Sequence, residues 1–330
     1  MTTTISPPAI SPAALCAATT TWHRPLLWLA AAMAGLAFVA FIGLLVDPRT
    51  VTGAPLWAKP LKFALSVGIY AVTLSWLIGL LPGTFARRRR LAWWAGTAAA
   101  VFLLVEMVII AGAAAGGLTS HFNVSTPFHA ALWSVMAASI VTVWVAAVPI
   151  AVLLLRADLG DPARALAIRA GLLIALVGMG LAFLMTGPTA AQLDDYQGIV
   201  GAHTVGVADG GPGLPVLGWS TVAGDLRIPH FVGMHALQVL PLAALLLEVL
   251  GRRITLLAHP LARRGTLRVL VGLYLGVLAL VTGQALAGQS VVQPSALVLA
   301  LGAALVVAAA LAVLLTLRRY PQPNRPTPAG

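Results

Sequence analysis

Long apolar stretches separated by short polar segments recur along the whole chain. A bilayer core about 30 Å thick needs roughly 20 consecutive apolar residues per helix. Eight stretches reach that length and predict membrane-spanning helices at about 25–46, 61–82, 91–115, 127–155, 166–186, 230–250, 267–288 and 295–317. The fold that this pattern predicts is all-α: a polytopic transmembrane helix bundle of eight spans.

Polar segments interrupt this pattern at both ends of the chain and once between spans. Residues 1–20 and 320–330 are rich in proline and threonine, which predicts disordered tails beside one transmembrane domain at 21–319. Residues 187–228, between the fifth and sixth spans, form a long glycine-rich connection. Loops of this length are usually functional or disordered. We predict a cap that lies on the outer surface, and a flexible linker is the alternative.

Composition places the chain in a bilayer. Hydrophobic residues make up 60% of the sequence and charged residues 9%, whereas soluble proteins average about 25% charged residues. A soluble fold this apolar lacks the polar side chains that would cover its surface. Cys16 is the sole cysteine, which excludes an internal disulfide and any cysteine-ligated zinc or iron–sulfur site.

The net charge of +11 reflects membrane topology and not nucleic-acid binding. With the N-terminus inside, sixteen of the 20 basic residues fall on the cytoplasmic side. The four basic residues on the outer side are Arg49, Lys59, Lys62 and Arg227. The positive-inside rule therefore predicts that both termini are cytoplasmic and that the number of spans is even.

Prolines recur at matching places in the two halves of the predicted bundle. The matching pairs, each at the start of a span that enters from outside, are Pro60 with Pro229 and Pro127 with Pro294. They raise the hypothesis of a duplication, a 4+4 parallel repeat. The pairs Gly112–Gly116 and Gly272–Gly276 match the GxxxG pattern of closely packed helices, and coincidence explains them equally well among 32 glycines.

Histidines gather on the outer side, where five of the seven lie: His121, His129, His203, His230 and His235. His129 falls in the first turn of the fourth span, and His235 lies about 8 Å below the outer end of the sixth. His230 and His235 point about 140° apart around a regular helix, so they cannot both ligate one ion. We predict His129 and His235 as ligands of a haem or a transition metal, and the other three as further candidates.

Glu106 is the one carboxylate deep within a predicted span, about 15 Å from its outer end. Intramembrane carboxylates often serve in proton relays, and a neutral glutamic acid that joins helices is the alternative. The two lysines, Lys59 and Lys62, are three residues apart and share one helix face. Their ammonium groups suit an anion or an ion pair with Glu106, and snorkelling to the interface is the alternative.

These residues predict a polar pocket in the outer half of the bundle, covered by the 187–228 loop. The pocket would bind a cofactor or an anionic ligand through Lys59, Lys62, Gln238 and Arg227. The exposed amides at the helix starts add to the preference for an anion, although Asp225 and Arg227 could also form a surface ion pair of little consequence. The full candidate set is Lys59, Lys62, Glu106, His129, His235, Gln238 and, near the outer end of the seventh span, Gln284.

Four stretches resemble a family of bacterial multi-pass membrane proteins to which no activity is assigned. They are GAPLWAKPLKFALS (53–66), SHFNVSTPFHAALW (120–133), AHTVGVADGGPGLPVLGWS (202–220) and GDLRIPHFVGMHALQVLPL (224–242). The resemblance covers about a fifth of the chain and implies a location in the bacterial cell (inner) membrane. The chain is also similar to haem A synthase in span number and in its two sets of four. That family places paired histidines in spans two, four, six and eight, whereas spans two and eight contain none here, so the chain is not assigned to it.

Three functions follow from these residues. The first is a membrane redox protein that binds haem or a metal, with Glu106 relaying protons. The second is a proton-coupled transporter of a small, anionic substrate, and the third is an enzyme or sensor that acts on lipids of the outer leaflet. A packing subunit without chemistry is the remaining alternative. The expected partners are the lipid bilayer and a small anionic ligand or lipid, in a monomer or an oligomer, and not nucleic acid.

Overall fold

The computed structural model of the chain describes residues 22–81 and 86–320. Within these ranges, eight helices are long and apolar enough to cross a membrane, which confirms the predicted helical bundle and fits an integral membrane protein. The predicted tails at 1–20 and, apart from Tyr320, at 320–330 lie outside the described residues. The eight helices are α2 (Arg24–Val46), α3 (Ala58–Gly79), α4 (Ala86–Ala115), α5 (Pro127–Arg156), α6 (Pro162–Leu181), α8 (Arg227–Leu250), α10 (Pro260–Leu286) and α11 (Ala296–Arg319).

Local sequence explains where several of these helices begin. The Thr126 hydroxyl caps α5 by accepting from the amide of His129, and Pro127 occupies the first turn, where its missing amide hydrogen is not needed. Asp161 caps α6 in the same way, ahead of Pro162. These caps fix the point at which the chain turns back into the bundle.

The helices pack as two sets of four. The first set is α2 to α5, and its apolar core also includes Ile168 and Leu172 of α6 and Leu237 of α8. The second set is α6, α8, α10 and α11, with a smaller core formed mainly by α6, α8 and α10. In the first set, α2 contacts α3 and α4, and α4 contacts α3 and α5. In the second set, α6 contacts α8 and α10, and α10 contacts α8 and α11. The sets meet where α5 packs against α6. This shared contact order is compatible with a duplication, and the repeat itself stays a prediction.

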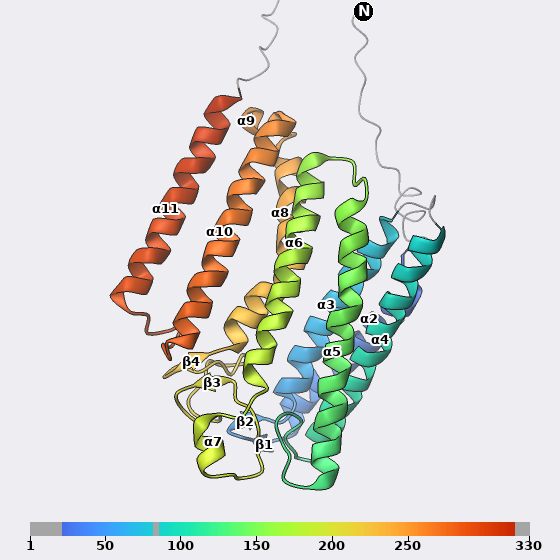
Figure 1. Cartoon of the computed structure of the whole chain (residues 1–330), viewed down its shortest axis with the longest axis vertical. Coiled ribbons are helices and arrows are strands. Elements are labelled where there is room, and N and C mark those ends of the chain that lie inside the picture. Colours follow the sequence, from blue (N-terminus) through green and yellow to red (C-terminus); the bar gives the residue numbers. More distant parts are fainter. Residues whose placement is uncertain (1–21, 82–85, 321–330) are drawn as a thin grey trace, which may run out of the picture.

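Helix α11 lies at one edge of the bundle and packs on α10 (Figure 1). None of the side chains of α11 is buried. An open groove of about 690 Å³ separates parts of the two helices, and it is lined mainly by small and aliphatic side chains.

The connections at one end of the bundle, here called the loop end, fold over the helices. Figure 1 shows α7 (Ala190–Asp194) and four two-residue strands grouped there, whereas α2 begins and α11 ends at the opposite end. The strands are β1 (Thr50–Val51), β2 (Ala54–Pro55), β3 (Thr204–Val205) and β4 (Gly224–Asp225), paired antiparallel as β1–β2 and β3–β4. A 3-10 turn (Ala182–Met185) leads out of α6 into this region.

Residues 186–226, here called the cap, are tied to the other connections by backbone and side-chain hydrogen bonds. The amide of Val124 donates to the carbonyl of Gly198, at 2.8 Å, and the amide of Val200 donates to the carbonyl of Phe122, at 2.9 Å. Ser290, between α10 and α11, donates from its hydroxyl to the carbonyl of Ser220. The cap therefore lies across the helix ends as a folded segment.

Candidate functional site

Glu106 on α4 is buried inside the bundle, with 2% of its side chain exposed. Its Oε1 lies 3.6 Å from Nε2 of His121, in the connection that follows α4. Within the described part of the chain, its other oxygen, Oε2, is buried and has no hydrogen-bond partner.

Three aromatic rings surround His121. Its ring centroid lies 5.7 Å from Phe63, 6.0 Å from Phe122 and 5.5 Å from Trp133. Burial among these rings lowers the pKa of His121 well below its usual value, and the positive charge of Lys59 lowers it further. His121 is therefore neutral at pH 7, with Nδ1 placed 3.1 Å from the hydroxyl of Ser120.

A second histidine, His203 in the cap, packs on the far side of Phe122, at 4.8 Å between ring centroids. Its Nδ1 donates to Oδ2 of Asp209 at 2.6 Å. Burial lowers the pKa of His203, and the hydrogen bond to Asp209 only partly offsets this effect. Burial alone would raise the pKa of Asp209, but hydrogen bonds from His203 and Thr204 outweigh it and hold that pKa well below its usual range.

Lys59, in the first turn of α3, lies beside this cluster. Its Nζ sits 5.8 Å from the centre of the Phe63 ring. Its charge is within electrostatic reach of Glu106, Lys62 and Arg227. Lys59 has no hydrogen-bond acceptor among the residues at 22–81 and 86–320. The ammonium group is therefore held in the site without a directly bonded counter-charge.

Lys62 and Arg227 hold the cap. Lys62 donates from Nζ to the carbonyl of Leu217 at 2.8 Å, and Arg227 donates from Nη2 to the carbonyl of Gly218 at 2.6 Å. Arg227 also forms a two-pronged ion pair with Asp225, with contacts of 2.9 and 2.6 Å. The ion pair that the sequence suggested therefore forms, but Asp225 is only 1% exposed, so its carboxylate is buried and does not lie at the surface. The cap folds over this carboxylate and desolvates it.

His235 and Gln238 form a separate pair on α8. His235 Nδ1 lies 3.2 Å from the amide oxygen of Gln238, whose amide nitrogen donates to the hydroxyl of Thr73 on α3. The ring of Phe231 packs on the imidazole at 4.3 Å. His235 Nε2 is buried and has no partner in the described ranges. This pair links the two sets of helices.

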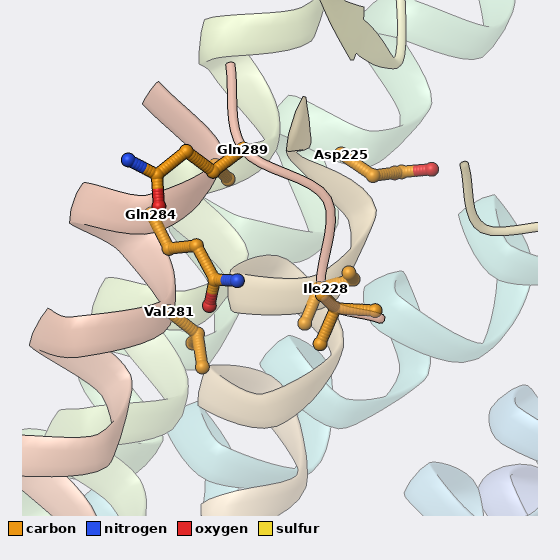
Figure 2. Close-up of a pocket in the computed structure, with 7 residues that line it drawn as sticks. Asp225, Ile228, Val281, Gln284 and Gln289 are labelled. Atoms are coloured by element: carbon orange, nitrogen blue, oxygen red, sulfur yellow. The ribbon is translucent and has the colours of Figure 1, made fainter. Parts of the chain in front are cut away.

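The other predicted residues have partners outside the Glu106 cluster. His129 contacts the hydroxyl of Thr126 in its own turn, at 3.0 Å, and His230 donates from Nδ1 to the carbonyl of Gly178, at 2.8 Å. Gln284 donates to the carbonyl of Ser290, at 2.8 Å. Figure 2 shows Gln284 and Gln289 at the end of α10, with the Asp225 carboxylate pointing away from both. Gln284 lines a small pocket together with Asp225, Ile228, Val281 and Gln289.

Sequence reasoning missed the aromatic rings around His121 and the partner of His203. Phe63, Phe122 and Trp133 read as ordinary apolar or interfacial residues in a chain that is 60% hydrophobic. Asp209 lies in the glycine-rich segment, six residues after His203, a spacing without a recognisable pattern. The only available signal for Asp209 was the presence of charged residues in a glycine-rich segment.

In the part of the chain that the structure describes, no group of three or more histidine, cysteine, aspartate or glutamate side chains is arranged to hold a metal ion. His129 and His235 share no contact among these residues, so their role as metal or haem ligands stays a prediction. No family model, curated protein or solved structure matches the chain.

Proposed function

We propose that this membrane protein is a proton-coupled carrier of a small anionic substrate, with Glu106 and His121 as its proton-binding pair. The observation that carries the proposal is the buried Glu106 carboxylate, which faces His121 at 3.6 Å and whose Oε2 has no hydrogen-bond partner among the described residues. A carboxylate in such a place is costly unless it is neutral or paired, so its few uses are mostly functional.

The surroundings of the pair favour proton exchange over a purely structural role. A structural carboxylic acid would donate or accept hydrogen bonds that join helices, and Glu106 is too far from His121 for a normal hydrogen bond. A small movement of the connection that carries His121 would close this gap. The charge of Lys59 nearby links the protonation of Glu106 to the presence of an anion.

Orientation forms part of the proposal. We place the loop end outside the cell and both termini in the cytoplasm, because the loop end holds only four of the 20 basic residues. The cap would then separate the Glu106 pair from the external solution. A carrier of this kind has to open the cap to load substrate, and the bacterial cell (inner) membrane is the proposed location.

The test uses purified protein in sealed liposomes that contain a pH-sensitive dye. A gradient of acetate or succinate, imposed at equal internal and external pH, should drive proton movement through the wild-type protein. Glu106→Gln should reduce that movement by at least tenfold, since the amide cannot bind and release the proton. Glu248→Gln is the matched control, because Glu248 pairs with Arg164 at the opposite end and should be dispensable. Equal proton movement in Glu106→Gln and wild type would contradict the proposal.

A second function, haem or metal binding, is favoured by one observation. His235 Nε2 is a buried imidazole nitrogen without a hydrogen-bond partner in the described part of the chain, and neutral imidazole nitrogens are common metal ligands. The test is a visible spectrum of the purified protein, oxidised and dithionite-reduced, with elemental analysis. A Soret band that disappears in His235→Ala or His129→Ala would support this function, and a colourless, metal-free protein would exclude it.

A further inference from the structure

Three cationic side chains, Lys59, Lys62 and Arg227, lie under one part of the cap, and only Arg227 has a directly bonded carboxylate in the described ranges. Arg227 is paired with Asp225, whereas Lys62 meets only a neutral carbonyl and Lys59 meets no acceptor within the described ranges. The two remaining carboxylates near Lys59 are engaged elsewhere, Glu106 facing His121 and Asp209 bonded to His203. Partly buried positive charge of this kind is stable only with a compensating anion or water.

The segment that covers these cations is a short hairpin, residues 213–220, here called the flap. Gly213 and Ser220 form its base, and the amide of Leu214 donates to the carbonyl of Trp219 at 2.8 Å. Gly218 has a φ of 66°, a left-handed conformation that places it between the two cations. A Cβ added to Gly218 would lie 3.7 Å from Lys62 Nζ and 3.9 Å from an Arg227 Nη atom.

We propose that Lys62, Arg227 and Lys59 bind an oxyanion, a carboxylate or a phosphate, and that the flap carbonyls of Leu217 and Gly218 occupy its place when the flap is closed. The two adjacent carbonyl oxygens accept hydrogen bonds from an ammonium and a guanidinium, and these are the donors that two oxygens of an oxyanion would use. The proposal rests on the proposed function in one respect, since it identifies the oxyanion as the charged group of the transported substrate.

Physical chemistry favours exchange of the flap for an oxyanion. A hydrogen bond to a charged oxygen is roughly twice as strong as one to a neutral carbonyl. The closed flap also contains Val216 at a φ of 66°, a strained conformation for a β-branched residue. Its side chain is 73% exposed, so packing of Val216 itself contributes little to the closed form. An arriving anion therefore competes with two neutral carbonyls on a hairpin that contains a strained residue.

The test measures binding by titration calorimetry on detergent-purified full-length protein at pH 7, with acetate, inorganic phosphate and, as the cationic comparison, choline. We expect acetate or phosphate to bind and choline not to bind. Lys62→Gln should weaken anion binding at least tenfold, and Lys62→Arg should retain most of it. Arg49→Gln is the matched control, because Arg49 is a loop-end cation that already pairs with Asp47.

A change in the flap should act in the opposite direction. Gly218→Ala disfavours the left-handed conformation of the closed flap, so we expect anion binding to tighten about fivefold.

Mass spectrometry of bound phospholipid separates two sources of phosphate. Phospholipid that wild type retains and Lys62→Gln loses identifies a lipid headgroup as the ligand, and the absence of such lipid identifies a soluble anion. Equal affinity in wild type and Lys62→Gln, or no anion binding in wild type and Gly218→Ala alike, would overturn the proposal. Anion binding without coupled proton movement would overturn only the carrier function.

Discussion

Asp209 organises the middle of the cap through its single carboxylate. It accepts hydrogen bonds from the backbone amides of His203 and Thr204, from the His203 ring and from the Thr204 hydroxyl. The low pKa of Asp209 means that its charged form stabilises the folded cap above about pH 4 and that this stabilisation is lost at lower pH. The lowered pKa of His203 means that its neutral form contributes fully above about pH 6.5 and less as the pH falls below that value.

We predict that acid loosens this part of the protein first. Amide hydrogen exchange near Thr204, corrected for the intrinsic rate, should be faster at pH 5 than at pH 7. Asp209→Asn should speed exchange at pH 7, because an amide cannot accept from both residues on both oxygens, at a local cost of about 1–3 kcal/mol. Asp194→Asn, at an exposed carboxylate on α7, is the control. Protection that is the same at both pH values would refute the prediction.

Some site residues can be recognised in the sequence by their charge alone, whereas the role of others depends on how the connections fold. Glu106 and the two lysines stood out because ionisable groups are rare in apolar spans, and the structure places them near one another. The sequence favoured His129 over His121 as a site residue, although both precede or begin the same helix. The fold of the connection after α4 brings His121 to Glu106, and the Thr126 cap keeps His129 in its own turn.

Helices α6 and α8 approach most closely at a pair of glycines. A Cβ on Gly178 would lie 2.2 Å from the carbonyl carbon of Gly233, a distance that no packed side chain tolerates. The hydrogen bond from His230 to the Gly178 carbonyl depends on the same approach. In contrast, Gly112 and Gly272, which begin the GxxxG patterns, have nothing within 4 Å of an added Cβ.

Gly178→Ala should therefore destabilise the bundle, whereas Gly112→Ala should not. Overpacking of a tight contact costs about 1–3 kcal/mol, and we expect the thermal unfolding temperature of Gly178→Ala to fall accordingly. Gly112→Ala should be neutral or slightly stabilising, by up to about 1 kcal/mol, because alanine is the better helix former. Equal unfolding temperatures for the two variants would show that α6 and α8 can separate without cost.

Helices were predictable from sequence and the connections between them were not. Twenty apolar residues admit one structure in hydrocarbon, because every backbone amide must be bonded within the segment. The cap obeys no such constraint. Its shape depends on contacts such as Lys62 with Leu217, which join residues far apart in the chain and leave no periodic signal.

The whole bundle should cross the membrane with the loop end outside. The native Cys16 and an introduced cysteine at Val222, a cap residue that is 57% exposed, offer a direct measurement. A membrane-impermeant maleimide added to intact cells should label Val222→Cys in a Cys16→Ser background and should leave the Cys16 protein unlabelled until the membrane is permeabilised. The reverse pattern would invert the topology and place the Glu106 pair on the cytoplasmic side.

The peripheral place of α11 has a consequence for the order in which the protein is made. Ala285, at the end of α10, is the last buried apolar side chain along the described chain. Every such core residue is therefore translated before α11 begins. Since chains fold from the N-terminal side during synthesis, the interior of the bundle does not need the final helix in order to pack.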